Sequence, residues 1–228
     1  MLFASCVAIL AESVACLLME RHGPTSWKHT ISGSPRYSWW VGGFHQAIVF
    51  PACALLALWP VLTGKTTLDT WLHWTWDDDE NSGCFYLHVA LLSYWAKDCI
   101  VVKLPALIWV HHIVCLFSVT ASMAGLLAQS TAVYTLGATA LELGSLANTV
   151  CELLPGLRVR LCMLGPMSIS NLFSTCLVVW YAWTFEGRGA QLASWWAAAA
   201  CGTVLSIIRQ QEFHGRMSQD FALRAKGA

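Results

Sequence analysis

Residues 104–127 read LPALIWVHHIVCLFSVTASMAGLL, an apolar run that contains two adjacent histidines, His111 and His112. A hydrocarbon core about 30 Å thick requires about 20 apolar residues in a helix, so this run is long enough to cross a bilayer. Ionisable side chains at that depth are costly and usually functional, because lipid cannot solvate them. We therefore expect the two histidines to face the interior of a helical bundle.

The composition of the whole chain indicates an all-α, polytopic membrane protein. The 228 residues are 57% hydrophobic and only 11% charged, unlike an ordinary soluble domain. The first apolar run has no basic region before it and carries Glu12, so we interpret it as a retained span rather than a signal peptide. About seven spans are expected in total: 2–19, 38–62, 84–103, 105–128, 130–154, 160–184 and 190–209.

The distribution of lysine and arginine predicts the orientation. With a lumenal N-terminus and a cytosolic C-terminus, only Lys65 and Arg188 face the lumen. The cytosolic segments then hold the other basic residues: Arg21, Lys28, Arg36, Lys97, Lys103, Arg158, Arg160, Arg209, Arg216, Arg224 and Lys226. The acidic run DDDE at 77–80, which follows several tryptophans, is then expected to form an interfacial loop on the lumenal side.

Several other polar side chains fall at similar depths in their spans. From the nearest cytosolic basic residue, a rise of 1.5 Å per residue places His45 about 13 Å, His111 about 12 Å and Asp98 about 8 Å into the membrane. The same rise places Asn148 at about 15 Å and Glu142 at about 24 Å. These depths predict one shared site in the cytosolic half, whereas His88, near the lumenal start of its span, belongs elsewhere.

Each of these residues also has a purely structural interpretation. A single membrane histidine often makes only a helix-to-helix hydrogen bond worth about 1 kcal/mol, and Asp98 could simply pair with Lys97. Consecutive helix positions are about 100° apart, so His111 and His112 must point in different directions. We expect one of them to react or bind and the other to orient it. Adjacent histidines do not readily ligate one ion from a regular helix, so we expect no metal.

Four stretches of the chain carry a family likeness. They are GGFHQAIV with His45, LLSYWAKDCI with Tyr94 and Asp98, WVHHIVCL with the histidine pair, and ALELGSLANT with Glu142 and Asn148. In order and spacing they resemble the TLC-domain family, which includes ceramide synthases and smaller lipid-regulating proteins.

The resemblance implies a barrel of six helices over residues 38–210, preceded by a helix and cytosolic loop at 1–37 and followed by a cytosolic tail at 211–228. It also implies residence in the endoplasmic reticulum or another endomembrane. In ceramide synthases, the double histidine and the acidic motif carry transfer of an acyl group from acyl-CoA to a sphingoid base.

By that resemblance the catalytic residues are His111, His112 and Asp98, and the substrate-binding residues are His45, Tyr94, Glu142 and Asn148. The chain departs from the synthase pattern at two positions. Cys115 replaces the usual threonine, and Thr139 replaces the first aspartate of the D-x-x-D motif, which leaves one carboxylate where synthases have two. The pattern ELGSLAN resembles the smaller proteins more closely.

We therefore expect a protein that accommodates a lipid acyl chain and acts in lipid metabolism or homeostasis. If it is an enzyme, it is an acyl-CoA-dependent N-acyltransferase with acyl-CoA as co-substrate and no other cofactor. The alternative is a non-catalytic subunit of a larger assembly or a small proton-coupled transporter. Its partners would be a membrane lipid and a membrane protein or second copy, and the zero net charge gives no indication of nucleic acid.

Overall fold

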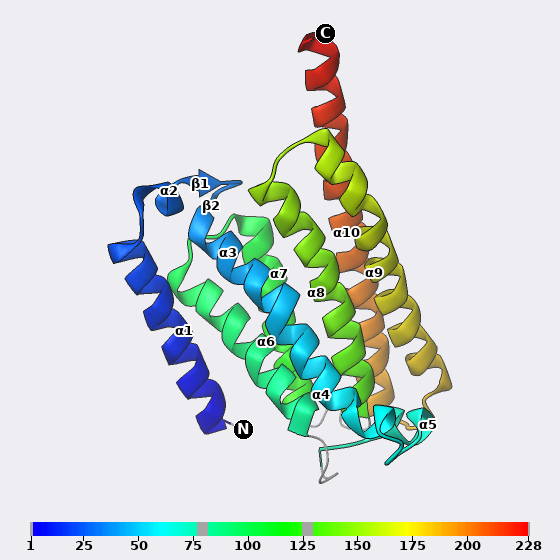
Figure 1. The fold of residues 1–228 in the computed structure, drawn as a ribbon. Coiled ribbons are helices and arrows are strands. Elements are labelled where there is room, and N and C mark those ends of the chain that lie inside the picture. Colours follow the sequence, from blue (N-terminus) through cyan, green and yellow to red (C-terminus); the bar gives the residue numbers. More distant parts are fainter. Residues whose placement is uncertain (1, 77–81, 125–129, 228) are drawn as a thin grey trace.

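The computed structural model describes residues 2–76, 82–124 and 130–227, nearly all of them helical (Figure 1). A two-residue pair of antiparallel strands forms a small hairpin, β1 (Thr30–Ile31) with β2 (Ser34–Pro35). The helices are α1 (Leu2–His22), α2 (Thr25–Lys28), α3 (Arg36–Phe44), the π-helix η1 (His45–Val49), α4 (Phe50–Leu62), α5 (Leu68–Leu72), α6 (Ser82–Val101), α7 (Ala106–Met123), α8 (Thr131–Leu153), α9 (Leu157–Thr184) and α10 (Ala190–Gly227).

Four of the described helices are long and apolar enough to cross a membrane. They are α1, the continuous helix Arg36–Leu62, α9 and α10. Helix α7 has a shorter apolar segment, Ile108–Met123. Helices α6 and α8 lie in the same bundle, but they carry several of the charged groups noted above. The acidic run at 77–80 and the end of the range 105–128 lie outside the described residues.

The expected cytosolic tail at 211–228 is not a separate segment. Helix α10 was expected to end at residue 209, but it continues to Gly227. The helix packs on the bundle beyond residue 209, where Phe213 is 1% exposed and joins a small apolar cluster with α8 and α9, whereas residues 221–225 are exposed. Arg160 of α9 also donates a hydrogen bond to Asp220 over 2.7 Å.

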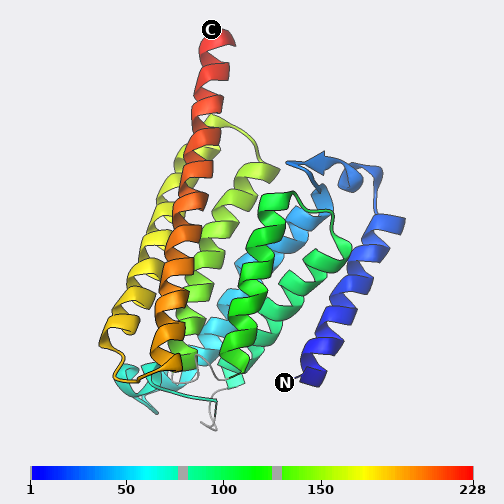
Figure 2. The same cartoon turned by 180° about the vertical axis from the view of Figure 1, so that it is seen from behind.

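The two ends of the bundle differ. One end, here called the hairpin end, carries α2, the strand pair and the connection from α8 to α9 (Figure 1). The opposite end carries α5 and the start of α1. Helix α8 packs on α9 and α3, α10 packs on α9, and α6 packs on α1, α4 and α7. Seen from behind, α7 and α10 both lie on the near side of the bundle, and α8 is visible between them further back (Figure 2).

The π-helix η1 sets the direction of two polar side chains. Pro51 at the start of α4 has no N–H to donate, and the preceding turn is widened so that the Phe50 N–H bonds to the His45 carbonyl. His45 and Gln46 are both buried although they are adjacent in sequence. The widened turn therefore brings two consecutive polar residues into the protein interior.

Candidate functional site

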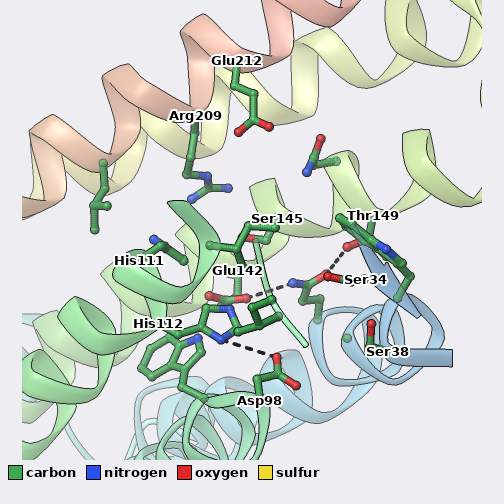
Figure 3. A pocket seen from close by; sticks show the side chains of 18 of the residues that line it. Ser34, Ser38, Asp98, His111, His112, Glu142, Ser145, Thr149, Arg209 and Glu212 are labelled. Atoms are coloured by element: carbon green, nitrogen blue, oxygen red, sulfur yellow. Dashed lines mark hydrogen bonds and ion pairs between the residues drawn. The ribbon is translucent and has the colours of Figure 1, made fainter. Parts of the chain in front are cut away.

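Two cavities meet inside the bundle. The polar cavity, about 190 Å³, lies toward the hairpin end and is lined by α3, η1, α6, α7, α8 and α10. The apolar cavity, about 470 Å³, lies between α7, α8, α9 and α10. Five residues line both cavities and define what we call the junction: Trp95, His111, Glu142, Leu205 and Arg209. The labelled side chains around the polar cavity come from the hairpin and from helices α3, α6, α7, α8 and α10 (Figure 3).

Most of the residues proposed from sequence lie at this site. The polar cavity is lined by six of the seven: Tyr94, Asp98, His111, His112, Glu142 and Asn148. Their helices are far apart in sequence, so the convergence results from the packing of α6, α7 and α8. For Asp98, His111, Glu142 and Asn148, depth along each span predicted a shared site, and these four line one cavity.

His45 is the exception, and its expected place in the substrate site needs correction. Its Nδ1–H donates to the Val41 carbonyl over 2.9 Å, and its Nε2 lies 3.4 Å from Glu12 of α1. Its ring stacks on Tyr94 with centroids 5.2 Å apart. Because of the direction set by η1, His45 lies behind Tyr94 and joins α1 to the bundle.

The adjacent histidines diverge, as their spacing on a helix requires. His112 Nδ1 lies 3.5 Å from Asp98 Oδ2 of α6 (Figure 3). The His111 ring instead lies beside Cys115, one turn further along α7, with Nε2 and Sγ 3.7 Å apart. Only His111 lines both cavities, so the two imidazoles have different surroundings and can have different tasks.

Asp98 both pairs with Lys97 and lies in the polar cavity, the two roles that the sequence suggested for it. Its Oδ1 lies 2.8 Å from Lys97 Nζ, so the ion pair with the neighbouring lysine exists. The pair is buried rather than at a membrane edge, because Lys97 is 0% exposed and Asp98 is 5% exposed. Since Oδ2 faces His112, Asp98 also links this buried cation to the histidine pair.

Gln46 is a site residue that the sequence did not reveal. Its amide donates to Glu142 Oε2 over 3.1 Å and accepts from the Thr149 hydroxyl over 2.9 Å. It therefore holds the Glu142 carboxylate in the polar cavity. The only sequence signal was a polar residue directly after His45, and a regular helix would have turned one of the two away.

Arg209 is the second site residue that was missed, because it was counted as a marker of the cytosolic edge. Its side chain lies at the junction, and Nη2 donates to the Leu141 carbonyl of α8 over 2.8 Å. A Cβ atom on Gly144 would clash with Ser170 Oγ and lie 2.8 Å from Arg209 Nη2. Gly144 thus allows α9 and the guanidinium to approach α8.

Charged side chains close the polar cavity at the hairpin end. Arg216 of α10 donates to Glu152 of α8 and to Glu212, and Ser32 of the hairpin turn donates to the same Glu152. This network ties the extended part of α10 to α8 and the hairpin.

Small residues on α10 create the apolar cavity. Ala197, Ala198, Cys201 and Gly202 all face it. No described atom outside the helix lies within 4 Å of a Cβ built on Gly202. The lining also includes exposed side chains, Cys201 and the 77% exposed Phe117, so the cavity reaches the outer surface between α7 and α10.

Comparison with known proteins gave no match. No family model matches the chain, and no curated protein or solved structure has significant similarity to it. The functional argument therefore depends on the geometry of the two cavities.

Proposed function

We propose that this chain is a multi-pass membrane protein that holds a lipid acyl chain in the apolar cavity, with the polar end of the lipid at the junction. The observation that carries the proposal is the joining of a large apolar cavity to a smaller one lined with polar groups. An apolar cavity of about 150 Å³ is enough to bind benzene, and this one is about 470 Å³. The protein would then act in lipid metabolism or homeostasis.

The proposed architecture is the TLC-type barrel of six helices with α1 packed outside it, seven spans in all. It is supported by α6, α7 and α8, which have 20, 18 and 23 residues and lie within the same bundle as the four longer helices. The proposed N-terminus is lumenal and the C-terminus cytosolic, in the endoplasmic reticulum or another endomembrane. The start of α1 and the end of α10 lie at opposite ends of the bundle, which agrees with an odd number of spans (Figure 1).

Topology can be tested in cells. An epitope fused after residue 228 should be reached by antibody when only the plasma membrane is permeabilised. A glycosylation acceptor placed after Gly187, between α9 and α10, should be modified because that loop is proposed to be lumenal. An epitope that is reached only after the endomembranes are opened would reverse the orientation.

The lipid-binding proposal is tested by filling the apolar cavity. Gly202→Leu places a side chain in open space, and leucine is the better helix former, so the variant should fold. We expect native mass spectrometry to show wild-type protein with bound lipid and Gly202→Leu with most of it lost. Ala200→Leu is the matched control, because Ala200 is exposed on the same helix and does not line the cavity. Equal lipid retention by all three proteins would contradict the proposal.

N-acyl transfer is a second candidate, favoured by His112 and Asp98 lying together in the polar cavity. In that reaction an amine attacks the carbonyl of acyl-CoA, the carbon–sulfur bond breaks, and CoA leaves as a thiol. His112, oriented by Asp98, would accept the proton of the amine and return it to the leaving thiolate.

The test is purified protein with acyl-CoA and several long-chain amines, analysed by mass spectrometry. Wild type should form the amide, and His112→Ala should not. If no amide and no acyl adduct appear, lipid binding without catalysis remains. If purified wild type also retains no lipid, the non-catalytic subunit or the proton-coupled transporter becomes the better explanation.

A further inference from the structure

We infer that the junction selects a lipid whose head group has no net charge but both donates and accepts hydrogen bonds, as the head of a monoacylglycerol does. The inference rests on the proposed lipid binding and adds the chemical class of the head group. It is based on two residues of the junction, the acid Glu142 and the base Arg209, which do not form a direct ion pair with each other.

The first step concerns charge pairing among the lining residues. Three acids line the polar cavity: Asp98, Glu142 and Glu212. Asp98 lies 2.8 Å from Lys97, and Glu212 lies 2.5 Å from Arg216. In the described part of the chain, Glu142 has no cation within 4 Å, and Arg209 has no acid within that distance.

Glu142 and Arg209 nevertheless lie at the same level. The Arg209 guanidinium is bonded to the carbonyl of Leu141, the residue next to Glu142, and both side chains line both cavities. They are therefore opposite charges at one junction without a direct contact between them. A ligand group that enters the junction can then contact both side chains.

The second step concerns unused hydrogen-bonding capacity. Glu142 Oε2 accepts from Gln46, whereas Oε1 has no donor among the described residues. The guanidinium uses Nη2 for Leu141 and Met167, and its Nε and Nη1 have no acceptor in the same part of the chain. A guanidinium carries five N–H donors, and a carboxylate only accepts hydrogen bonds. A matching head group therefore accepts a hydrogen bond from Arg209 and donates one to Glu142.

The third step concerns net charge. A carboxylate, sulfonate or ammonium in the junction would leave one charge uncompensated in a site walled by Trp95 and Leu205, which is costly away from water. An ester carbonyl and a hydroxyl have no such cost. The uncharged head is therefore favoured, and the first methylenes of the chain pass between the two apolar side chains into the apolar cavity.

The test compares three probes with the same 14-carbon chain: 1-monomyristoylglycerol, tetradecyl sulfonate and tetradecyltrimethylammonium. The last two carry permanent charges, so neither can become neutral by gaining or losing a proton. Binding to wild-type protein in nanodiscs would be measured by competition with a fluorescent lipid, below micellar concentrations. We expect the uncharged probe to bind about tenfold more tightly than either charged probe.

Two variants should each make a charged probe bind most tightly, and the sign of the preferred charge should differ between them. Glu142→Gln leaves Arg209 uncompensated and should make the sulfonate the preferred probe. Arg209→Gln leaves Glu142 uncompensated and should make the trimethylammonium probe preferred. Arg209→Lys keeps the charge and should keep the wild-type order. Glu186→Gln is the matched control, since Glu186 is exposed between α9 and α10 and lines neither cavity, so the order should not change.

The outcomes separate this inference from lipid binding itself. If none of the probes binds wild-type protein, the proposed function fails. If the probes bind but a charged one is preferred by wild type, the head-group assignment is overturned while lipid binding stands. The same holds if the preference of folded Glu142→Gln and Arg209→Gln proteins does not change. If either glutamine variant does not fold, wild type and Arg209→Lys still decide the question.

Discussion

Two buried histidines on neighbouring helices have contrasting environments. His88 of α6 is 0% exposed and fully bonded: its Nδ1–H donates to the Cys84 carbonyl over 2.7 Å, and Nε2 accepts from the Ser122 hydroxyl over 2.9 Å. Its ring also packs on Trp76 and Tyr134. His111 of α7 has Cys115 beside it and faces two cavities.

The contrast separates two uses of a polar side chain in an apolar bundle. Where every donor and acceptor is satisfied and no space remains, the group stabilises helix packing. Where donors face a cavity, the group is available to a ligand. The His88 region is thus expected to respond to mutation through stability, and the junction through binding.

The largest effect is expected at Lys97, a fully buried cation that forms an ion pair with Asp98. Lys97→Met would leave Asp98 buried without its closest cation, and breaking a buried ion pair in this way costs about 3–5 kcal/mol. The unfolding transition in detergent should shift strongly. Lys103→Met, an exposed lysine just past the same helix, should change stability by less than about 0.5 kcal/mol. Equal shifts in both variants would show that the buried pair does not stabilise the bundle.

A smaller effect is expected from the histidines themselves. His88→Ala would leave the Ser122 hydroxyl without its partner and create a void, at a cost of about 3 kcal/mol. His111→Ala should cost less than about 1 kcal/mol, because it enlarges an existing cavity, but should weaken lipid binding. Thermal unfolding and native mass spectrometry of both variants would measure the two responses. The contrast between the two histidines would be wrong if His88→Ala kept wild-type stability but lost bound lipid while His111→Ala lost stability but kept bound lipid.

The same contrast explains what the sequence could predict. Helices form at each of the seven apolar ranges, because apolar length is directly visible in sequence. Depth estimates pointed to a shared site for Asp98, His111, Asn148 and Glu142, and the family resemblance added Tyr94 and His112; all six line the polar cavity, whereas His45, placed at a similar depth, does not.

Rotation about each helix axis could not be predicted. In a span that is apolar on all sides, periodicity does not mark the inner face, so packing against neighbours decides it. His45 turned toward Glu12 and Gln46 toward Glu142 because of a π-turn that has no simple sequence signature. Arg209 lies within the bundle because α10 continues past it. Basic residues served to mark the membrane edge, so Arg209 could not be placed inside the bundle from sequence.

The smallest effects are expected from two glycines that mark a packed and a hollow region. A Cβ on Gly83 of α6 would clash with the backbone of Leu56 and Ala57 in α4, and backbone atoms cannot rotate away. Gly83→Ala should therefore destabilise the protein by about 1–3 kcal/mol. No described atom outside the helix lies within 4 Å of a Cβ on Gly202, so Gly202→Ala should instead raise stability by up to about 1 kcal/mol, the gain of alanine over glycine within a helix.

Opposite signs for the same chemical change would be a sharp test of the two environments, because both substitutions add one methyl group to a helix. Unfolding midpoints of the two variants, measured in one detergent, are sufficient. If Gly202→Ala were as destabilising as Gly83→Ala, the space beside α10 would have to be filled by side chains. The apolar cavity, and with it the acyl-chain site, would then be wrong.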